Sequence, residues 1–246
     1  DQPHWVPGSE RGQLYYTQDQ LDTLVAEAIK AGFDPHIHAI GDAAVRRALN
    51  AYDHARQQLG SGFRPAIAHV ELADPADFGR FQSLGVLPVM SYQWAQQAPY
   101  SIEAVKDQIG PERYARMEPE GSLMNAGATI AYGSDWPVDA MPGDPMPNTP
   151  LSATQIAVTR TFPFPDSPYT GQTLHAEEVV AVGDMMAAYT INAAKALRMD
   201  GQVGSIEVGK LADFVVLDAD PYTTPSDQIM QIGVVQTLFA GQVVYD

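Results

Sequence analysis

The sequence predicts an α/β fold with a parallel sheet, followed by a short β-rich segment. Between residues 17 and 200, short apolar runs alternate with longer segments whose apolar residues recur at helical spacing. This alternation is typical of βαβ units, whose strands are parallel. From Gly201 onward the pattern changes to short β-rich runs joined by turns that contain glycine. We therefore expect two domains, residues 1–200 and residues 201–246.

The composition indicates a globular protein that binds a small molecule. The chain has 246 residues, 45% of them hydrophobic, which is enough to build a core. A net charge of −16 argues against binding nucleic acid or a membrane surface, since both contacts need clustered Lys and Arg. The chain has no apolar run near the roughly 20 residues of a membrane helix, and its first residues do not form a signal peptide. We expect a cytoplasmic protein, although any signal would lie upstream of this chain.

The first elements are predicted from capping residues and from periodicity. Thr17 and Gln20 have the spacing of a capping box, so a helix is expected to begin there. A strand follows at 33–39, and an amphipathic helix follows at 43–59. Asp42, directly before this helix, is expected to cap it.

The rest of the chain continues the alternation. Further strands are expected at Ala66–Val70, Val86–Ser91 and Ala128–Tyr132. Further helices are expected at 75–84, 120–126, 149–160 and 182–199. The connections 92–119 and 136–150 are long and are expected to be loops that line a binding site. In the β-rich segment, Gly241-Gln242 is expected to form a hairpin tip.

Three side chains suited to binding a metal follow three of the predicted strands. His38, His69 and Asp135 each lie at the C-terminal end of a different strand, and these ends share one rim in a parallel α/β fold. Two imidazoles and a carboxylate suit Zn²⁺, but they do not exclude Fe²⁺, Mn²⁺ or Ni²⁺. Each residue also has a structural alternative: a lone histidine is more often a hydrogen-bonded structural residue, and an aspartate often caps a turn.

Neighbouring residues are assigned supporting roles. His36 projects from the same face of its strand as His38 but lies deeper, so we expect it to support the site without binding the metal. Trp94, Tyr100 and Trp136 either line a pocket or pack in the core, and the sequence leaves both alternatives open. The chain has no cysteine, which excludes disulfides and thiolate metal ligands.

Five ordered motifs resemble one family. They are HAIGDAAVRRAL, IAHVEL, AYGSDWPV, AAYTINAAKAL and GSIEVGKLADFVVLD. Together they resemble the later portion of metal-dependent amidohydrolases, in particular the branch of YtcJ-like proteins and N-substituted formamide deformylases. The resemblance extends from about Thr17 to the end of the chain.

The resemblance implies a (β/α)8 TIM barrel with a small β-sandwich. The four strands would be strands five to eight of the barrel, and residues 201–246 the C-terminal part of the sandwich. His38 and His69 would be metal ligands, and Asp135 would both contact the metal and act as the catalytic residue that transfers the proton of the attacking water. The implied activity is metal-dependent hydrolysis, with zinc as the first choice, of amide or formamide C–N bonds other than peptide bonds.

Two features of the family are missing from this chain. The first barrel strand with its His-x-His pair and the bridging group of the fourth strand, often a carboxylated lysine, are absent. His36-Ile37-His38 is not that pair, because the GDAAVRRAL that follows and the later His69 and Asp135 match the fifth strand onward. We therefore expect a C-terminal half of an amidohydrolase: a truncated chain, a proteolytic product or one piece of a two-piece enzyme.

An alternative function follows from this truncation. A half-barrel has two exposed sheet edges and an uncovered core. As it stands, the chain would then be catalytically silent and lack the metal. It would need a complementary N-terminal piece or would associate with itself as a homo-oligomer.

Overall fold

The computed structural model describes residues 14–102, 104–138 and 149–246. The chain forms two compact units, the first from residues 1–89 and 102–129 and the second from residues 90–101 and 130–246. A separate domain from Gly201 onward stays a prediction. Most of the predicted 136–150 loop, residues 139–148, lies outside the described residues.

The first unit contains the beginning of a parallel sheet and the helices around it. Its strands are β1 (His36–Ala39), β2 (Ala66–His69) and most of β3 (Leu87–Met90). Its helices are α1 (Gln18–Lys30), α2 (Asp42–Leu59), the 3-10 helix η1 (Pro75–Asp77), α3 (Phe78–Leu84), α5 (Lys106–Tyr114) and α6 (Glu120–Asn125). β1 pairs with β2 and β2 with β3, both in parallel. The predicted α/β class with a parallel sheet is thus confirmed.

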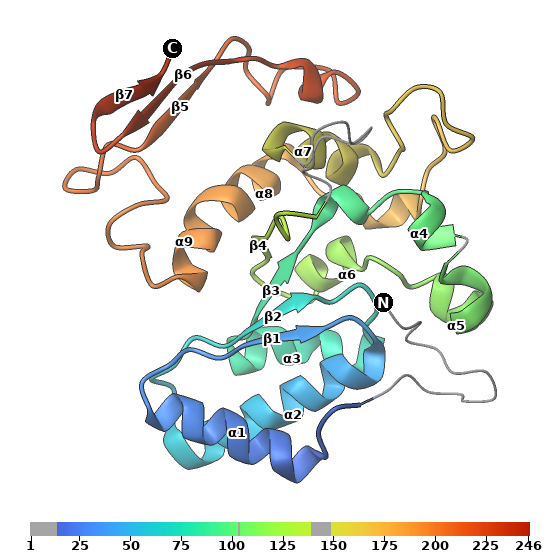
Figure 1. Ribbon diagram of the computed structural model, residues 1–246, viewed down its shortest axis with the longest axis vertical. Coiled ribbons are helices and arrows are strands. Elements are labelled where there is room, and N and C mark those ends of the chain that lie inside the picture. The colour runs from blue at the N-terminus through green and yellow to red at the C-terminus, as the bar shows by residue number, and fades with distance from the viewer. Residues whose placement is uncertain (1–13, 103, 139–148) are drawn as a thin grey trace. The chain divides into compact units, whose positions relative to one another are not determined.

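Helix α2 buries the side that its sequence periodicity predicts. The buried residues include Val45, Ala48, Leu49, Tyr52 and Ala55. Figure 1 shows α2 between α1 and the strand β1, and it contacts both. Helix α1 begins after Thr17 with the predicted capping box. Local pattern alone therefore determined both helices.

The second unit contains one further strand of the parallel sheet and a separate antiparallel sheet. Its strands are β4 (Ala131–Tyr132), β5 (Phe214–Leu217), β6 (Val234–Phe239) and β7 (Gln242–Tyr245). Its helices are η2 (Tyr92–Trp94), α7 (Pro150–Thr159), η3 (Ala176–Glu178), α8 (Val182–Ala187), the π-helix η4 (Ala188–Asn192), α9 (Ala193–Ala196) and η5 (Ile229–Gln231), with α4 (Pro99–Ile102) at the boundary between the units. The hydrogen-bonded order of the parallel sheet is β1-β2-β3-β4, and the boundary falls within β3.

The prediction that 92–119 is a loop is wrong. The segment contains η2, α4 and α5. Helix α5 is interrupted at Gly110, whose φ of 76° is not helical, and Pro111 follows it. None of its described residues is buried. Because α5 buries no residue and contains Gly110 and Pro111, its sequence pattern resembles that of a loop.

The antiparallel sheet has the order β5-β6-β7 and ends in a tight hairpin. Ala240 and Gly241, with φ of 48° and 78°, lie between β6 and β7. Positive φ at both central residues is the requirement of a type I′ turn. The predicted β-rich segment is confirmed, but the predicted hairpin tip is displaced by one residue.

Both faces of this antiparallel sheet expose apolar side chains. Consecutive residues of a strand point to opposite faces. Val215 and Val216 are 57% and 43% exposed, and Val243 and Val244 are 50% and 61% exposed. Among the described residues, both faces of the sheet therefore have apolar side chains exposed to solvent.

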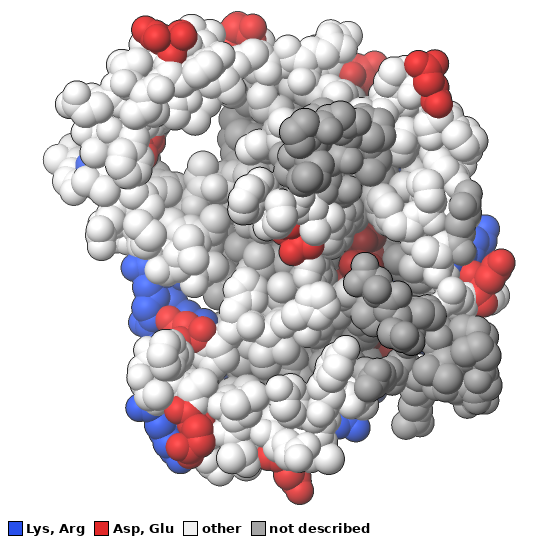
Figure 2. Space-filling model, viewed as in Figure 1, with Lys and Arg blue, Asp and Glu red and all other residues white. Residues whose placement is uncertain are grey.

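The surface and the helices add two further observations. On the face drawn in Figure 2, the described Lys and Arg side chains lie in separate small groups, some of them beside Asp or Glu. Among the described residues, no helix combines the length and the apolarity needed to cross a membrane.

The hydroxyl of Tyr52 links the starts of two strands, and its removal should destabilise the first unit. The side chain is fully buried, and its oxygen lies 3.0 Å from the carbonyl oxygen of Pro35 and 2.8 Å from that of Ala66. We expect Tyr52→Phe to lower the free energy of unfolding by about 1–3 kcal/mol, because buried carbonyls lose a donor. Urea unfolding measures this loss in the free energy of unfolding, and the m value should stay unchanged.

Tyr222→Phe is the matched control, because Tyr222 is 64% exposed. It should change the free energy of unfolding by less than about 0.5 kcal/mol. Equal urea midpoints for the two variants would show that the Tyr52 hydroxyl does not link the strands.

Candidate functional site

Two histidines converge at the C-terminal ends of β1 and β2. The ring centroids of His38 and His69 are 4.4 Å apart, and the rings are T-shaped with an interplanar angle of 68°. His69 is buried, whereas His38 is exposed. Two imidazoles from neighbouring parallel strands thus meet at the end of the sheet where α/β enzymes place their active sites.

The backbone at the end of β2 brings these rings together. The register pairs His38 with Ala68 and Ala39 with His69, so strict alternation would point the two histidines to opposite faces of the sheet. His69 and Val70 instead have φ of 76° and 55°, in the left-handed region. Such a conformation costs about 1–3 kcal/mol in a residue other than glycine. It breaks the alternation and allows the ring of His69 to contact that of His38.

His36 lies two residues before His38 on the same strand face. Desolvation by the surrounding protein lowers the pKa of His36, which favours its neutral form, although part of the side chain is exposed to solvent. The supporting role that we predicted for His36 stays a prediction.

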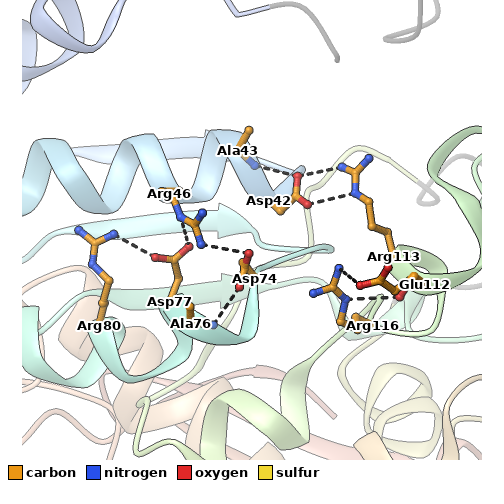
Figure 3. A network of polar contacts seen from close by, with 10 residues as sticks. All are labelled: Asp42, Ala43, Arg46, Asp74, Ala76, Asp77, Arg80, Glu112, Arg113 and Arg116. Atoms are coloured by element: carbon orange, nitrogen blue, oxygen red, sulfur yellow. Dashed lines mark hydrogen bonds and ion pairs between the residues drawn. The ribbon is translucent and has the colours of Figure 1, made fainter. Parts of the chain in front are cut away.

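The segment 104–119, which follows β3 in the chain, is hydrogen-bonded to one residue shortly after each histidine. Arg113 of α5 donates from Nε and Nη2 to the two carboxylate oxygens of Asp42, at 3.0 and 2.8 Å (Figure 3). The amide of Glu118 donates to the carbonyl oxygen of Glu71 at 2.7 Å. Asp42 follows His38 by four residues, and Glu71 follows His69 by two. The segment 104–119 is therefore attached to residues that come shortly after each histidine in the chain.

The prediction that Asp42 caps α2 is wrong. The N-cap is Gly41, and Asp42 is the first residue of the helix. Its Oδ1 accepts from the amide of Ala43 at 2.9 Å, a favourable position for a carboxylate near a helix N-terminus. The carboxylate also binds Arg113, a residue far along the chain that local sequence spacing does not reveal.

A second group of charges fixes the connection after β2. Asp74 caps η1 and accepts from the amide of Ala76 at 3.0 Å. The buried carboxylate of Asp77 accepts from Arg46 Nε at 2.7 Å and from Arg80 Nη1 at 3.0 Å (Figure 3). Since its partners come from α2 and α3, this group is structural and attaches the helices to each other.

Asp135 lies in the second unit, three residues past the end of β4. It is exposed and adopts φ of 53°, in the left-handed region. The turn before it is attached to the end of β3: the amide of Gly133 donates to the carbonyl oxygen of Met90 at 3.1 Å, and Ser91 Oγ donates to the carbonyl oxygen of Gly133 at 2.7 Å. Asp135 thus projects from a backbone turn that neighbouring residues hold in place.

A buried glutamine that the sequence reading missed also contacts this turn. Gln93 Nε2 donates to the carbonyl oxygen of Ser134 at 2.9 Å, and the hydroxyl of Tyr132 donates to Gln93 Oε1 at 3.1 Å. Burial raises the pKa of Tyr132 to about 12, so its hydroxyl keeps its proton at neutral pH. The only available signal was a polar residue soon after a predicted strand, in the run SYQWAQQ.

The described residues contain no group of three or more His, Asp and Glu side chains that could hold a metal ion. His38 and His69 meet in the first unit, and Asp135 belongs to the second unit. The set of His38, His69 and Asp135 as metal ligands therefore stays a prediction.

The sequence model of the amidohydrolase family matches residues 2–245 of the chain. The chain belongs to the amidohydrolase family. The predicted resemblance to this family is thus confirmed, and it covers both units described above.

Three curated proteins match nearly all of this chain. An N-substituted formamide deformylase from Arthrobacter pascens is 25% identical over 100% of the chain and 43% of its own length. The putative amidohydrolase YtcJ from Bacillus subtilis is 26% identical over 100% of the chain and 44% of its own length. Protein LONG AFTER FAR-RED 3 from Arabidopsis thaliana is 30% identical over 92% of the chain and 36% of its own length. The chain spans less than half the length of these relatives.

Solved structures share the fold of this amidohydrolase chain. A metal-dependent hydrolase from Pyrococcus furiosus has a TM-score of 0.67 at 24% identity, covering 88% of this chain and 40% of its own. A Xaa-Pro dipeptidase with methionine in its active site has a TM-score of 0.65 at 20% identity, covering 97% of this chain and 51% of its own. These structures establish the likeness of fold.

Shortening Arg113 should release the segment 104–119 of this amidohydrolase chain. In Arg113→Lys, the two-point contact with Asp42 becomes a single contact at best. Because the ion pair is partly exposed, we expect a loss of roughly 1 kcal/mol, which is about fivefold faster amide exchange in 104–119. Hydrogen exchange measured by mass spectrometry tests this.

Arg116→Lys serves as the control. Arg116 contacts Glu112 within the same segment, with Nη2 to Oε1 at 3.8 Å, so its replacement should leave the attachment to α2 intact. Identical exchange in the two variants would mean that the pair of Arg113 and Asp42 does not hold the segment.

Proposed function

We propose that this chain supplies the C-terminal half of a metal-dependent hydrolase. In this proposal, β1 to β4 are strands five to eight of a (β/α)8 barrel, and residues 201–246 are the C-terminal part of a β-sandwich. The observation that carries the proposal is the pair of His38 and His69, whose rings lie 4.4 Å apart at the C-terminal ends of neighbouring parallel strands. Barrel enzymes build their active sites at these strand ends.

The donor groups fit a divalent cation. Two imidazoles meet at one point of the rim, and the chain offers no thiolate. His38, His69 and Asp135 would hold the ion, with Zn²⁺ as the first choice and Fe²⁺, Mn²⁺ or Ni²⁺ suited to the same ligands. When bound, such an ion polarises a carbonyl group and lowers the pKa of a coordinated water toward neutrality.

Asp135 is the proposed proton carrier. Its carboxylate is exposed at the end of β4 and accepts the proton of the water that attacks the carbonyl carbon. As the C–N bond breaks, Asp135 returns this proton to the leaving nitrogen. The products of a formamide are formate and the protonated amine, so atoms and protons balance with one water consumed.

The substrate class is proposed from the relatives. The N-substituted formamide deformylase matches the whole chain at 25% identity. The Xaa-Pro dipeptidase matches at 20% identity and indicates the fold alone. We therefore favour a C–N bond of the amide or formamide type over a peptide bond. The substrate is a small molecule in either case.

Exposed apolar surface supports a complementary partner. Both faces of the sheet β5-β6-β7 carry exposed valines, and the exposed His38 lies on β1, at one edge of the parallel sheet. The matched relatives are more than twice as long as this chain. We propose that an N-terminal half, or a second copy of the chain, covers these surfaces.

Removing either histidine should remove the metal. In the protein that carries this chain, we expect His38→Ala and His69→Ala to lose bound metal together with turnover. Asp135→Asn should lower turnover by about 10²- to 10⁴-fold, the usual contribution of a positioned acid or base. Elemental analysis of the Zn-loaded protein and formate release from N-substituted formamides measure the two effects.

His54→Ala is the control, because His54 lies on α2 and its ring contacts Gln58. It should retain both metal and turnover. Full metal content and full turnover in all three site variants would refute the assignment.

The second candidate function is a catalytically silent half-barrel, favoured by the exposed sheet faces. The purified chain would then be free of metal and self-associated, and it would release no formate. Native mass spectrometry combined with elemental analysis separates the two candidates. A monomer with a full metal complement that hydrolyses a formamide would exclude the silent form.

A further inference from the structure

We propose that Gln93 is a positioning residue that fixes the turn carrying Asp135. This inference rests on the proposed role of Asp135 in proton transfer. Gln93 is 5% exposed, and its side-chain amide bridges two residues of the turn: Nε2 donates to the carbonyl oxygen of Ser134 at 2.9 Å, and Oε1 accepts from the hydroxyl of Tyr132 at 3.1 Å. Ser134 directly precedes Asp135, so Gln93 constrains the backbone from which the carboxylate projects.

The partners of Gln93 determine the orientation of its amide. The carbonyl oxygen of Ser134 can only accept, so Nε2 must face it and Oε1 must face Tyr132. The buried hydroxyl of Tyr132 keeps its proton at neutral pH and donates it to Oε1. Both ends of the amide are therefore satisfied, and rotation by 180° would break both hydrogen bonds.

The backbone of Gln93 is itself held. Its carbonyl oxygen accepts from Gln96 Nε2 at 2.7 Å and from the hydroxyl of Tyr100 at 3.3 Å. Gln93 also lies within the 3-10 helix η2. The amide thus reaches the turn from a supported position, as a positioning group should.

The turn needs such support. Asp135 has φ of 53°, a conformation that costs about 1–3 kcal/mol in a residue other than glycine. Strand β4 has two residues and ends at Tyr132, before the turn begins. The contacts of Gly133 with Met90 and Ser91 hold the first part of the turn, and Gln93 holds the peptide directly before Asp135.

Strand β4 has separate support from the π-helix η4. The rings of Tyr132 and Tyr189 lie 4.0 Å apart, and Asn192 Nδ2 donates to the carbonyl oxygen of Ile130 at 2.9 Å. These contacts act on the strand before the turn. Loss of the Gln93 amide should therefore loosen residues 133–135 and leave β4 in place.

Replacing Gln93 with methionine tests the proposal, because methionine has a similar length and makes no comparable hydrogen bonds. In the metal-free chain, we expect the amides of residues 134–136 to exchange at least tenfold faster. In the Zn-loaded protein, kcat for formate release from N-substituted formamides should fall about 10- to 100-fold, since a misplacement of about 1 Å has effects of this size. KM and metal content should stay nearly unchanged, which a general loss of structure would not produce.

Gln97→Met is the matched control. Gln97 is the same residue type four positions later, and its Nε2 donates to the carbonyl oxygen of Thr173 at 2.8 Å, away from the turn. This variant should have the same amide exchange rates at residues 134–136 and the same kcat as the parent protein. If Gln93→Met does not fold, Tyr132→Phe is the second variant, because it keeps the ring and removes the hydroxyl that orients the amide of Gln93. It should also raise the amide exchange rates of residues 134–136 and lower kcat.

The outcomes separate the two proposals. If Asp135→Asn abolishes turnover and Gln93→Met behaves like Gln97→Met, the positioning role is overturned and the proposed function stands. If Gln93→Met changes only KM, or only the amide exchange rates, and leaves kcat unchanged, the positioning role is also overturned. If Asp135→Asn keeps full turnover, the proposed role of Asp135 in proton transfer fails, and the role of Gln93 fails with it.

Discussion

Left-handed backbone at two strand ends is the constraint on which the candidate site depends. His69 has φ of 76° and Asp135 has φ of 53°. At His69 this conformation breaks the side-chain alternation of β2 and allows the ring to contact His38. Such conformations persist only where surrounding contacts offset their cost. The amide of Val70, which donates to the carbonyl oxygen of Ala39 at 3.1 Å, is one of these contacts.

Each unit supports its own part of the site. In the first unit, Arg113 and Glu118 attach the segment 104–119 to residues that directly follow the two histidines. In the second unit, Gln93 attaches η2 to the turn before Asp135. All of these supports come from segments beyond strand ends, where α/β enzymes vary their loops to change specificity while the sheet stays constant.

The exposed apolar surface and the length of the relatives agree with each other. A three-stranded sheet with valines exposed on both faces leaves apolar surface in contact with water. The chain matches 36–44% of the length of its curated relatives. A further segment that covers both faces would remove the exposed surface.

Local sequence predicted helices α1 and α2, the strands of the parallel sheet and the family, but it missed the helices within 92–119. Periodicity located α2, the Thr17 capping box located the start of α1, and ordered motifs identified an amidohydrolase. It also placed candidate residues at strand ends, because parallel strands share one rim. Tertiary structure decided what those residues contact. The hydrogen bonds of Gln93 with Ser134 and of Arg113 with Asp42 join residues separated by 41 and 71 positions. Local sequence patterns extend over a few residues only, so they do not predict partners this far apart in the chain.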